Sequence, residues 1–284
     1  MFNVKFTKKM ISYLATLVIV LAMTVTVAQS RPDVDWNTGV VRVIGEGVGK
    51  QEYKNNPGKF RLTAIKAARM DAQAQLVSYI ETEVKTNASM TDYELDIYNV
   101  QVSAQGIVRN AVEVGEPEYN REEGTAKVVL EMPLFGGKGS VAEVAFLPFR
   151  DETKVSFPQP VDLEIINQPT VVNSNYTGLI VDCSNMNINC VMSPVIKNAN
   201  GQAIYGHQNL DYDKIIVNGM ASYADSAYDE ISKARAGNNP LIIKAINLSD
   251  LNANPVVSME DADKILAANQ YDKFLENCAV VFVK

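Results

Sequence analysis

The chain has 284 residues, of which 47% are hydrophobic and 21% charged, a balance typical of a folded protein with one large or two ordinary domains. This composition excludes a disordered chain, and the net charge of −7 argues against a general nucleic-acid-binding protein. Three cysteines and one histidine leave little material for a zinc site or a histidine-based triad.

Residues 1–28 predict a secretory signal peptide. Three lysines and no acidic residue come first, an apolar run follows over residues 11–27, and Ala28 ends a small-residue cleavage site. The run is near the lower limit for a membrane span, so cleavage is favoured over an uncleaved anchor helix. No cysteine lies near the junction, so we expect no acylation. Loss of the three lysines would leave 23 basic against 33 acidic residues, a net charge of −10.

The first predicted domain spans residues 36–134. Residues 40–49 predict a strand, and Asn56-Pro57 predicts the start of a helix that runs to about residue 86. Apolar residues recur along this helix every three or four positions, and their small size would let a sheet approach closely. They are Ile65, Ala68, Ala72, Leu76, Ile80 and Val84.

The remainder of this domain predicts an antiparallel sheet. Residues 87–108 favour a strand and then a short helix, and residues 112–134 predict a β-hairpin that turns at Glu122–Gly124. We therefore expect the α+β class, with a helix packed on an antiparallel sheet.

Residues 135–172 predict a proline-rich linker or extended arm that lies on the surface or clasps a neighbour. Residues 173–284 predict a second small α/β or α+β domain. Its strongest signals are a hairpin turn at Asn200-Gly201, a helix over residues 221–237 that ends at Gly237, and a helix capped by Ser258 and Asp261.

The glycines of the first strand raise the question of nucleotide binding. Gly45, Gly47 and Gly49 form G-x-G-x-G rather than G-x-G-x-x-G, and polar residues separate them from the helix. A phosphate-binding loop also needs Ser or Thr after its lysine, whereas Gln51 follows Lys50. We expect these glycines to let the sheet twist or the helix pack over it.

The other reactive side chains offer little chemistry. The paired acids favour a solvated surface over catalytic carboxylates. The cysteines favour buried apolar roles, and a disulfide between Cys183 and Cys190 is the alternative. Any acid–base or metal site would have to recruit His207. We therefore assign no catalytic, cofactor-binding or metal-binding residue, and no cofactor. The acids are Glu81 and Glu83, Glu116 and Glu118, Glu122 and Glu123, Asp211 and Asp213, and Glu260 and Asp261; the third cysteine is Cys278.

Residues 40–134 resemble the Lpp-twenty-type lipoprotein domain of the bacterial envelope, which flagellar assembly protein T and its relatives share in similar form. The likeness rests on a G-x-G strand, an alanine-rich helix and a closing V-x-x-M-P-L strand. The residues that carry it are Ala67, Ala68, Asp71, Ala72, Leu76, Gly106, Val108, Ala111, Val112, Val129, Met132 and Leu134. Many members carry a lipid-bearing cysteine, which this chain lacks.

The resemblance implies a non-enzymatic, exported cell-envelope protein of the periplasm or the outer-membrane region. It would be a structural or assembly subunit that contacts envelope or flagellar proteins, or itself as a homo-oligomer, and not nucleic acid. Outer-membrane association is left open, but without acylation. The alternative is a periplasmic hydrolase or ligand-binding protein with a site between the two domains, built from carboxylates and His207.

The predicted cleavage site can be tested directly. Protein purified from its native host should begin near Gln29, because the basic, apolar and small-residue regions occur in the order that signal peptidase recognises. N-terminal sequencing measures this. Recovery of an intact Met1 in the membrane fraction would contradict the prediction.

Overall fold

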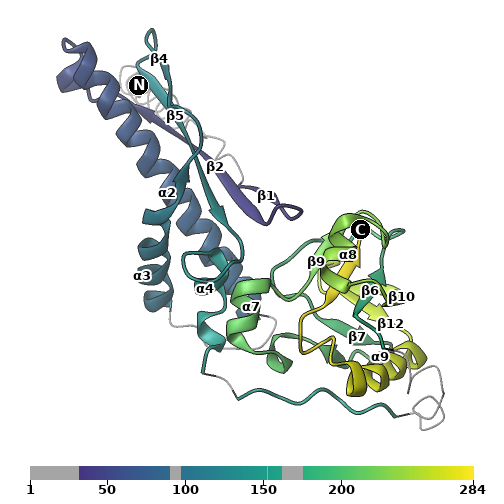
Figure 1. Ribbon diagram of the computed structural model, residues 1–284. Coiled ribbons are helices and arrows are strands. Elements are labelled where there is room, and N and C mark those ends of the chain that lie inside the picture. The colour runs from purple at the N-terminus through teal and green to yellow at the C-terminus, as the bar shows by residue number, and fades with distance from the viewer. Residues whose placement is uncertain (1–31, 90–96, 152, 162–174) are drawn as a thin grey trace, which may run out of the picture. The chain divides into compact units, whose positions relative to one another are not determined.

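A long helix organises the N-terminal part of the protein (Figure 1). The structure is a computed structural model that describes residues 32–89, 97–151, 153–161 and 175–284, so the predicted signal peptide lies outside the described residues. Helix α2, Pro57–Ser89, begins as predicted, because the Asn56 side chain accepts a hydrogen bond from the Lys59 N–H at 3.1 Å.

Helix α2 packs on an antiparallel sheet, which confirms the predicted fold class. The sheet is built on two nine-residue strands, β2 (Val40–Val48) and β5 (Thr125–Pro133), which pair along their whole length. Strand β1 (Asp33–Asp35) borders β2, while β3 (Val112–Glu113) and β4 (Glu118–Asn120) border β5. The predicted hairpin is also present, and its turn residue Gly124 has a φ of +68°.

The predicted stripe of α2 is the face that contacts the sheet. Five of its six positions are buried, but Ile65 is only half-buried and Ala64 takes its place. Contact with the sheet therefore repeats every four residues along this part of the helix. The buried members are Ala64, Ala68, Ala72, Leu76, Ile80 and Val84.

The glycines of β2 let the helix approach this closely. A Cβ atom added to Gly45 or Gly47 would lie within 3.0 Å of the α2 backbone at Ala68, and one on Gly49 would meet the Phe60 ring. Gly45 and Gly47 carry no positive φ, so the constraint is space rather than conformation. The structural reading of these glycines is therefore confirmed, in the form of close helix packing.

The outer edge of β2 is capped by side chains of α2. The Glu46 N–H donates to Asp71 Oδ2 at 3.0 Å, and the Ile44 carbonyl accepts from Gln75 Nε2 at 3.0 Å. Gln75 also donates to Asp71 Oδ2 at 2.8 Å, which holds both caps in place. An exposed edge strand can pair with a strand of another chain, and the Asp71 and Gln75 side chains oppose this by occupying hydrogen-bonding groups of β2.

The segment between α2 and the hairpin differs in part from the prediction. Helix α2 continues to Ser89, and the expected short helix is α3, Ile97–Ile107, followed by the 3-10 turn η2, Val108–Asn110. Residues 87–89, where a strand was predicted to begin, are helical, so that expectation was wrong there. Residues 90–96 lie outside the described residues.

The predicted linker is folded in its N-terminal part, over residues 135–150. Residues 135–150 include helix α4, Val141–Ala145, and the 3-10 turn η3, Leu147–Phe149, and most of the α4 side chains are buried. Small apolar side chains there pack into the core, so an extended arm was wrong for these residues. Residues 153–161 are extended, as expected, and Val161 N–H donates to Asp263 Oδ1 at 2.8 Å. Residues 162–172 lie outside the described residues.

The C-terminal residues form two further four-stranded sheets. The first is wholly parallel, in the order β10 (Pro240–Lys244), β6 (Gly178–Asp182), β13 (Val280–Val283) and β9 (Ser222–Ala224). The second has the order β11 (Asn247–Ser249), β12 (Asn254–Val257), β7 (Ile196–Asn198) and β8 (Ala203–Tyr205). The hairpin between β7 and β8 turns at Gly201, φ +82°, as predicted.

Helices connect these strands, and the predicted start of one helix was wrong. Helix α8, Glu230–Ala236, ends at Gly237 as predicted, but residues 222–224 form β9 because the Asp229 cap starts the helix later. Helix α9, Met259–Asp272, has the predicted cap, in which the Asp261 N–H donates to Ser258 Oγ at 3.0 Å. The pattern did not reveal helix α7 (Tyr212–Asn218) or the 3-10 turn η1 (Gln51–Tyr53).

Close packing over the glycines makes a quantitative prediction. Gly47→Val should lower the free energy of unfolding by about 1 to 3 kcal/mol, because its side chain would collide with the α2 backbone. Urea denaturation measures this. Gly106→Ala in α3 is the matched control, since a Cβ there meets nothing within 4 Å, and it should be neutral or stabilising.

Lys50→Ala should change neither stability nor function, because the lysine side chain is exposed and its contact with Glu52 is 4.0 Å long. Nucleotide binding that disappears in Lys50→Ala would contradict the structural reading of the loop.

Candidate functional site

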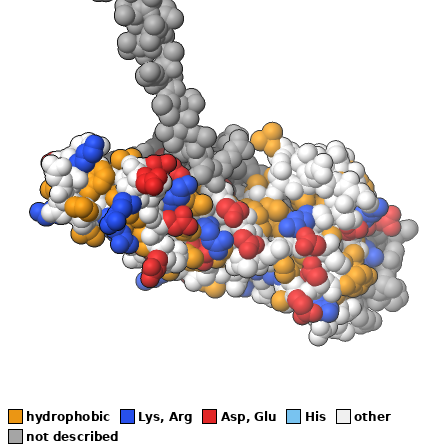
Figure 2. All heavy atoms as spheres, turned by 90° about the horizontal axis from the view of Figure 1, so that it is seen from above, with side chains coloured by type: hydrophobic (Ala, Val, Ile, Leu, Met, Phe, Trp, Pro, Cys, Tyr) orange, Lys and Arg blue, Asp and Glu red, His pale blue; other side chains and the backbone are white. Residues whose placement is uncertain are grey.

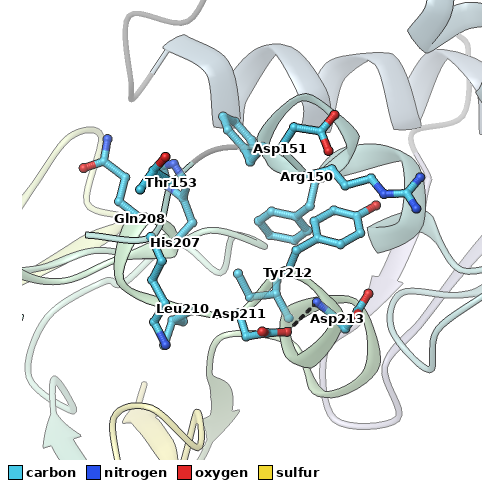
Figure 3. Close-up of a pocket in the computed structure, with 13 residues that line it drawn as sticks. Arg150, Asp151, Thr153, His207, Gln208, Leu210, Asp211, Tyr212 and Asp213 are labelled. Atoms are coloured by element: carbon cyan, nitrogen blue, oxygen red, sulfur yellow. Dashed lines mark hydrogen bonds between the residues drawn. The ribbon is translucent and has the colours of Figure 1, made fainter. Parts of the chain in front are cut away.

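The candidate site is a pocket of about 300 Å³ where residues 146–154 meet residues 207–215 (Figure 3). The pocket is lined by His207, the only histidine of the chain, and by Asp211 and Asp213 at the start of α7. Its other charged lining residues are Arg150, Asp151 and Lys154, so positive and negative groups share one rim.

Two short 3-10 turns build the buried part of the pocket. Phe149 belongs to η3 and His207 to η4 (His207–Asn209), and their rings pack with centroids 4.5 Å apart at 43°. Tyr212, the first residue of α7, donates from its hydroxyl to the Glu143 carbonyl at 2.9 Å. That bond ties α7 to helix α4 and fixes one wall of the pocket.

His207 sits in the pocket as a neutral side chain. Burial lowers its pKa from 6.5 to about 4, so the imidazole carries no charge at neutral pH. Asp211 does not act on it as an orienting carboxylate, because Asp211 caps α7. Its Oδ1 accepts from the N–H groups of Asp213 at 2.9 Å and Lys214 at 3.3 Å (Figure 3).

The arrangement is better suited to holding a small molecule than to proton transfer. A general base needs a pKa near the working pH and a partner that orients it, and the pKa of His207 lies well below neutral. Among the described residues, no group of three His, Cys, Asp or Glu side chains could hold a metal ion. The pocket offers an aromatic floor and a rim of mixed charge.

The other predicted acids take local roles. The Asn120 side chain accepts from the N–H groups of Glu122 and Glu123 in the hairpin turn. Asp261 belongs to the α9 cap. Glu83 is the exception, because burial raises its pKa to about 7. The remaining acids, Glu81, Glu116, Glu118 and Glu260, lie on helix faces or beside the hairpin.

The three cysteines are free thiols in the structure. Burial raises the pKa of Cys183 to about 12 and also raises those of Cys190 and Cys278, so the reactive thiolate is disfavoured in each. The prediction of buried apolar roles is confirmed for Cys183 and Cys278, whereas Cys190 is only half-buried.

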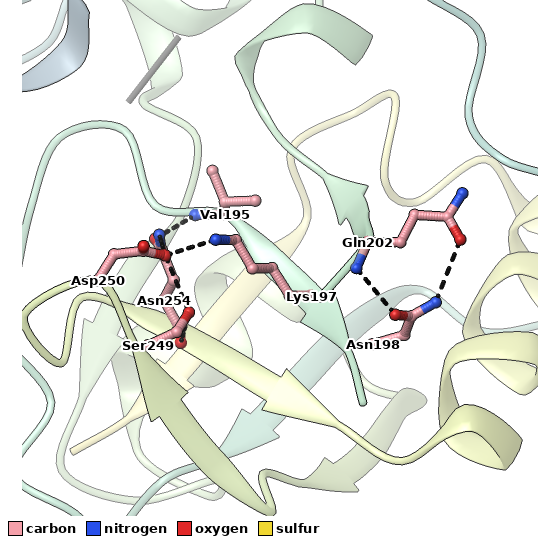
Figure 4. Close-up of polar contacts among 7 residues, drawn as sticks. All are labelled: Val195, Lys197, Asn198, Gln202, Ser249, Asp250 and Asn254. Atoms are coloured by element: carbon pink, nitrogen blue, oxygen red, sulfur yellow. Dashed lines mark hydrogen bonds and ion pairs between the residues drawn. The ribbon is translucent and has the colours of Figure 1, made fainter. Parts of the chain in front are cut away.

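A polar network lies beside a second pocket of about 250 Å³ that also contacts His207 (Figure 4). Asp250 accepts hydrogen bonds from Lys197 at 2.6 Å, Asn254 at 2.7 Å and Ser249 at 2.9 Å. These bonds lower the pKa of Asp250 to about 2, and the bond from Lys197 has the largest effect. The network fixes the turn between β11 and β12, where three consecutive non-glycine residues have positive φ.

Sequence reasoning missed most of this site. It named His207 and Asp211 but not Phe149, Tyr212 or the Lys197–Asp250 pair. The sequence Asp211-Tyr-Asp-Lys could have been read as a helix cap, which would have located α7. The contacts with Phe149 and Lys197 join distant segments, and nothing local in the sequence signals them.

A protein-family model matches the C-terminal sheets. Residues 178–284 match the family model of the second domain of Treponema pallidum Tp0624. The match starts at the first residue of β6 and includes His207 and the Asp250 network, but it excludes Phe149 and the preceding sheet. A comparison with curated proteins finds no match to this chain.

The buried His207 makes a prediction about acid stability. Its pKa is lowered from an ordinary value of 6.5 to about 4 in the folded protein, so the unfolded chain binds more protons between these values. Stability should therefore fall as the pH drops from 6.5 to 4. His207→Gln should remove about 3 kcal/mol of that loss, measured by urea denaturation across this range.

The Glu83→Gln variant is a control, because Glu83 should change the pH dependence of stability in the opposite direction to His207. The folded pKa of Glu83 is raised to about 7 from 4.5, so its contribution to stability is lost as the pH rises through that window. The variant should flatten the decline above pH 4.5. If stability falls equally between pH 6.5 and 4 in His207→Gln and in the parent, His207 is not buried as described.

Proposed function

We propose that this chain is an exported, non-enzymatic protein of the bacterial cell envelope that works as a structural or assembly subunit through protein contacts. The observation that carries the proposal is the face of the N-terminal sheet opposite α2, called the outer face below. Its apolar side chains are 42–63% exposed, and they are Ile44, Val48, Val112 and Val114. Clustered apolar exposure of this kind is typical of protein-binding surfaces.

The distribution of charge agrees with a protein partner. Figure 2 shows one face of the molecule on which acidic and basic side chains alternate with apolar ones, without a broad basic area. Nucleic-acid binding depends on such an area, and the chain is acidic as a whole. Within the described residues, every helix is too short or too polar to cross a bilayer.

The resemblance to the Lpp-twenty-type domain supplies the class of partner. Its alanine-rich helix and glycine-bearing strand are the pieces that pack together as α2 and β2. On that basis we propose envelope or flagellar proteins, or further copies of this chain, as partners in the periplasm or outer-membrane region.

A ligand-binding or hydrolytic function is the second candidate, and the His207 pocket favours it. The pocket has a volume suited to a small molecule and a buried imidazole. A neutral histidine packed on Phe149, with Asp211 engaged as a helix cap, supports binding over catalysis.

The two candidates differ in their dependence on His207. In the native host, His207→Ala should be exported and should complement a deletion strain as well as the parent, because the outer face does not involve this residue. His207→Gln is the companion variant with less loss of volume. Complementation, export and folding are measured together. A folded and exported His207→Ala protein that fails to complement would contradict the proposal and favour the pocket.

A further inference from the structure

We propose that the outer face is an isologous interface between two copies of this chain, with a two-fold axis that crosses the strands at Ile44 and Val129. This inference rests on the proposed function and specifies its partner and its surface. In an isologous interface the same patch meets itself, so each residue must suit the residue that the half-turn brings opposite.

Strand register places the outer-face side chains in rows. The middle row is apolar and consists of Ile44, Val129 and Val114, since Ile44 pairs with Val129 and the Val114 N–H bonds to the Val129 carbonyl. Side chains of β2 and β5 alternate between buried and accessible along both strands, so this row points away from α2.

Charged rows flank the apolar row in a checkerboard. On one side Arg42 bonds to Glu131, with Nε–Oε2 3.1 Å apart. On the other side Glu46 bonds to Lys127, with Nζ–Oε1 2.9 Å apart. From β2 to β5, the charges are therefore positive then negative in the Arg42–Glu131 row, and negative then positive in the Glu46–Lys127 row.

This checkerboard is complementary to itself. A half-turn about the middle row lays Arg42 over Glu46 of the second copy and Glu131 over Lys127 of the second copy. The same operation brings Ile44, Val129 and Val114 against their own counterparts. Between β2 and β5, opposite charges then meet on both sides of the apolar centre, which favours this register over others. Beyond β5 the same half-turn lays Val112, which pairs with Glu131, over Glu118 of the second copy, which pairs with Lys127, so the charge match is confined to β2 and β5.

The face is available for this contact, while the neighbouring strand edge is not. The Asp71 and Gln75 side chains already occupy hydrogen-bonding groups of β2 at Glu46 and Ile44, so strand addition there would have to displace them. Packing face to face leaves those bonds intact, and aligned sheets pack about 10 Å apart through their side chains.

The size of the face predicts a reversible dimer. The two nine-residue strands are roughly 30 Å long, and with the short strands β3 and β4 along the other side of β5 the face is three strands, roughly 14 Å, wide, so each copy offers about 430 Å². Stable interfaces bury about 800 Å² per partner, so association should be weak and concentration-dependent.

Sedimentation velocity of the full chain, expressed with its leader and processed by the host, tests the interface from about 1 to 300 μM. The parent should shift from monomer to dimer across this range. Ile44→Lys should raise the dissociation constant at least about tenfold, since it places a charge at the apolar centre. Met70→Lys is the matched control, because Met70 is 61% exposed but lies on α2, and it should dimerise like the parent.

A charge exchange tests the register without removing either ion pair. The double variant Arg42→Glu with Glu131→Arg keeps that pair within one copy but sets like charges opposite each other between copies, so it should be monomeric. Further exchange by Glu46→Lys with Lys127→Glu restores opposite charges at every position and should restore the dimer. Circular dichroism confirms that each variant is folded.

The outcomes separate this inference from the proposed function. A parent that stays monomeric at 300 μM, or a double variant that dimerises like the parent, overturns the interface while export and complementation can still succeed. Ile44→Lys that is monomeric but fully active in the host overturns the functional use of the dimer. Loss of export, or loss of complementation in His207→Ala, overturns the proposed function whatever the sedimentation result.

Discussion

The N-terminal part of the structure depends on the close approach of α2 to β2 over two residues without side chains. At Gly45 and Gly47 the strand backbone touches the helix backbone at Ala68, and alanine on the helix keeps the gap small. This approach brings the α2 side chains within reach of the strand edge, so Asp71 and Gln75 can cap β2. One steric constraint thus sets both the packing of the two layers and the protection of an edge. It also leaves the opposite face of the sheet as the accessible surface.

In the C-terminal sheets, side-chain hydrogen bonds hold a strained turn between β11 and β12. The Lys197–Asp250 pair and its amide and hydroxyl neighbours hold a turn in which three successive residues adopt left-handed φ values. Such a conformation costs of order 1 kcal/mol or more at each non-glycine residue and persists only where other contacts determine it. The low pKa of Asp250 reflects the same bonds, so one set of hydrogen bonds both stabilises the carboxylate and holds the turn.

The His207 pocket and the outer face represent two ways in which a surface can carry function. The pocket is concave and holds a buried imidazole, but the carboxylate of Asp211 is engaged as the cap of α7. The outer face is apolar at its centre and carries ion pairs on both sides of that centre. An apolar centre with a polar border is typical of protein interfaces, which need no residue with a perturbed pKa.

The fold class, the helix stripe, the caps at Asn56 and Ser258, and the turns at Gly124 and Gly201 could be predicted from the amino-acid sequence, because each depends on residues a few positions apart. The sequence also excluded a phosphate-binding role for the glycines by spacing alone. The three-dimensional structure was needed to show that residues 135–150 fold into the core, that Phe149 packs on His207 and that Asp71 caps a strand 25 residues away. These contacts join distant segments whose meeting depends on the whole arrangement of helices and sheets, and local periodicity carries no record of it.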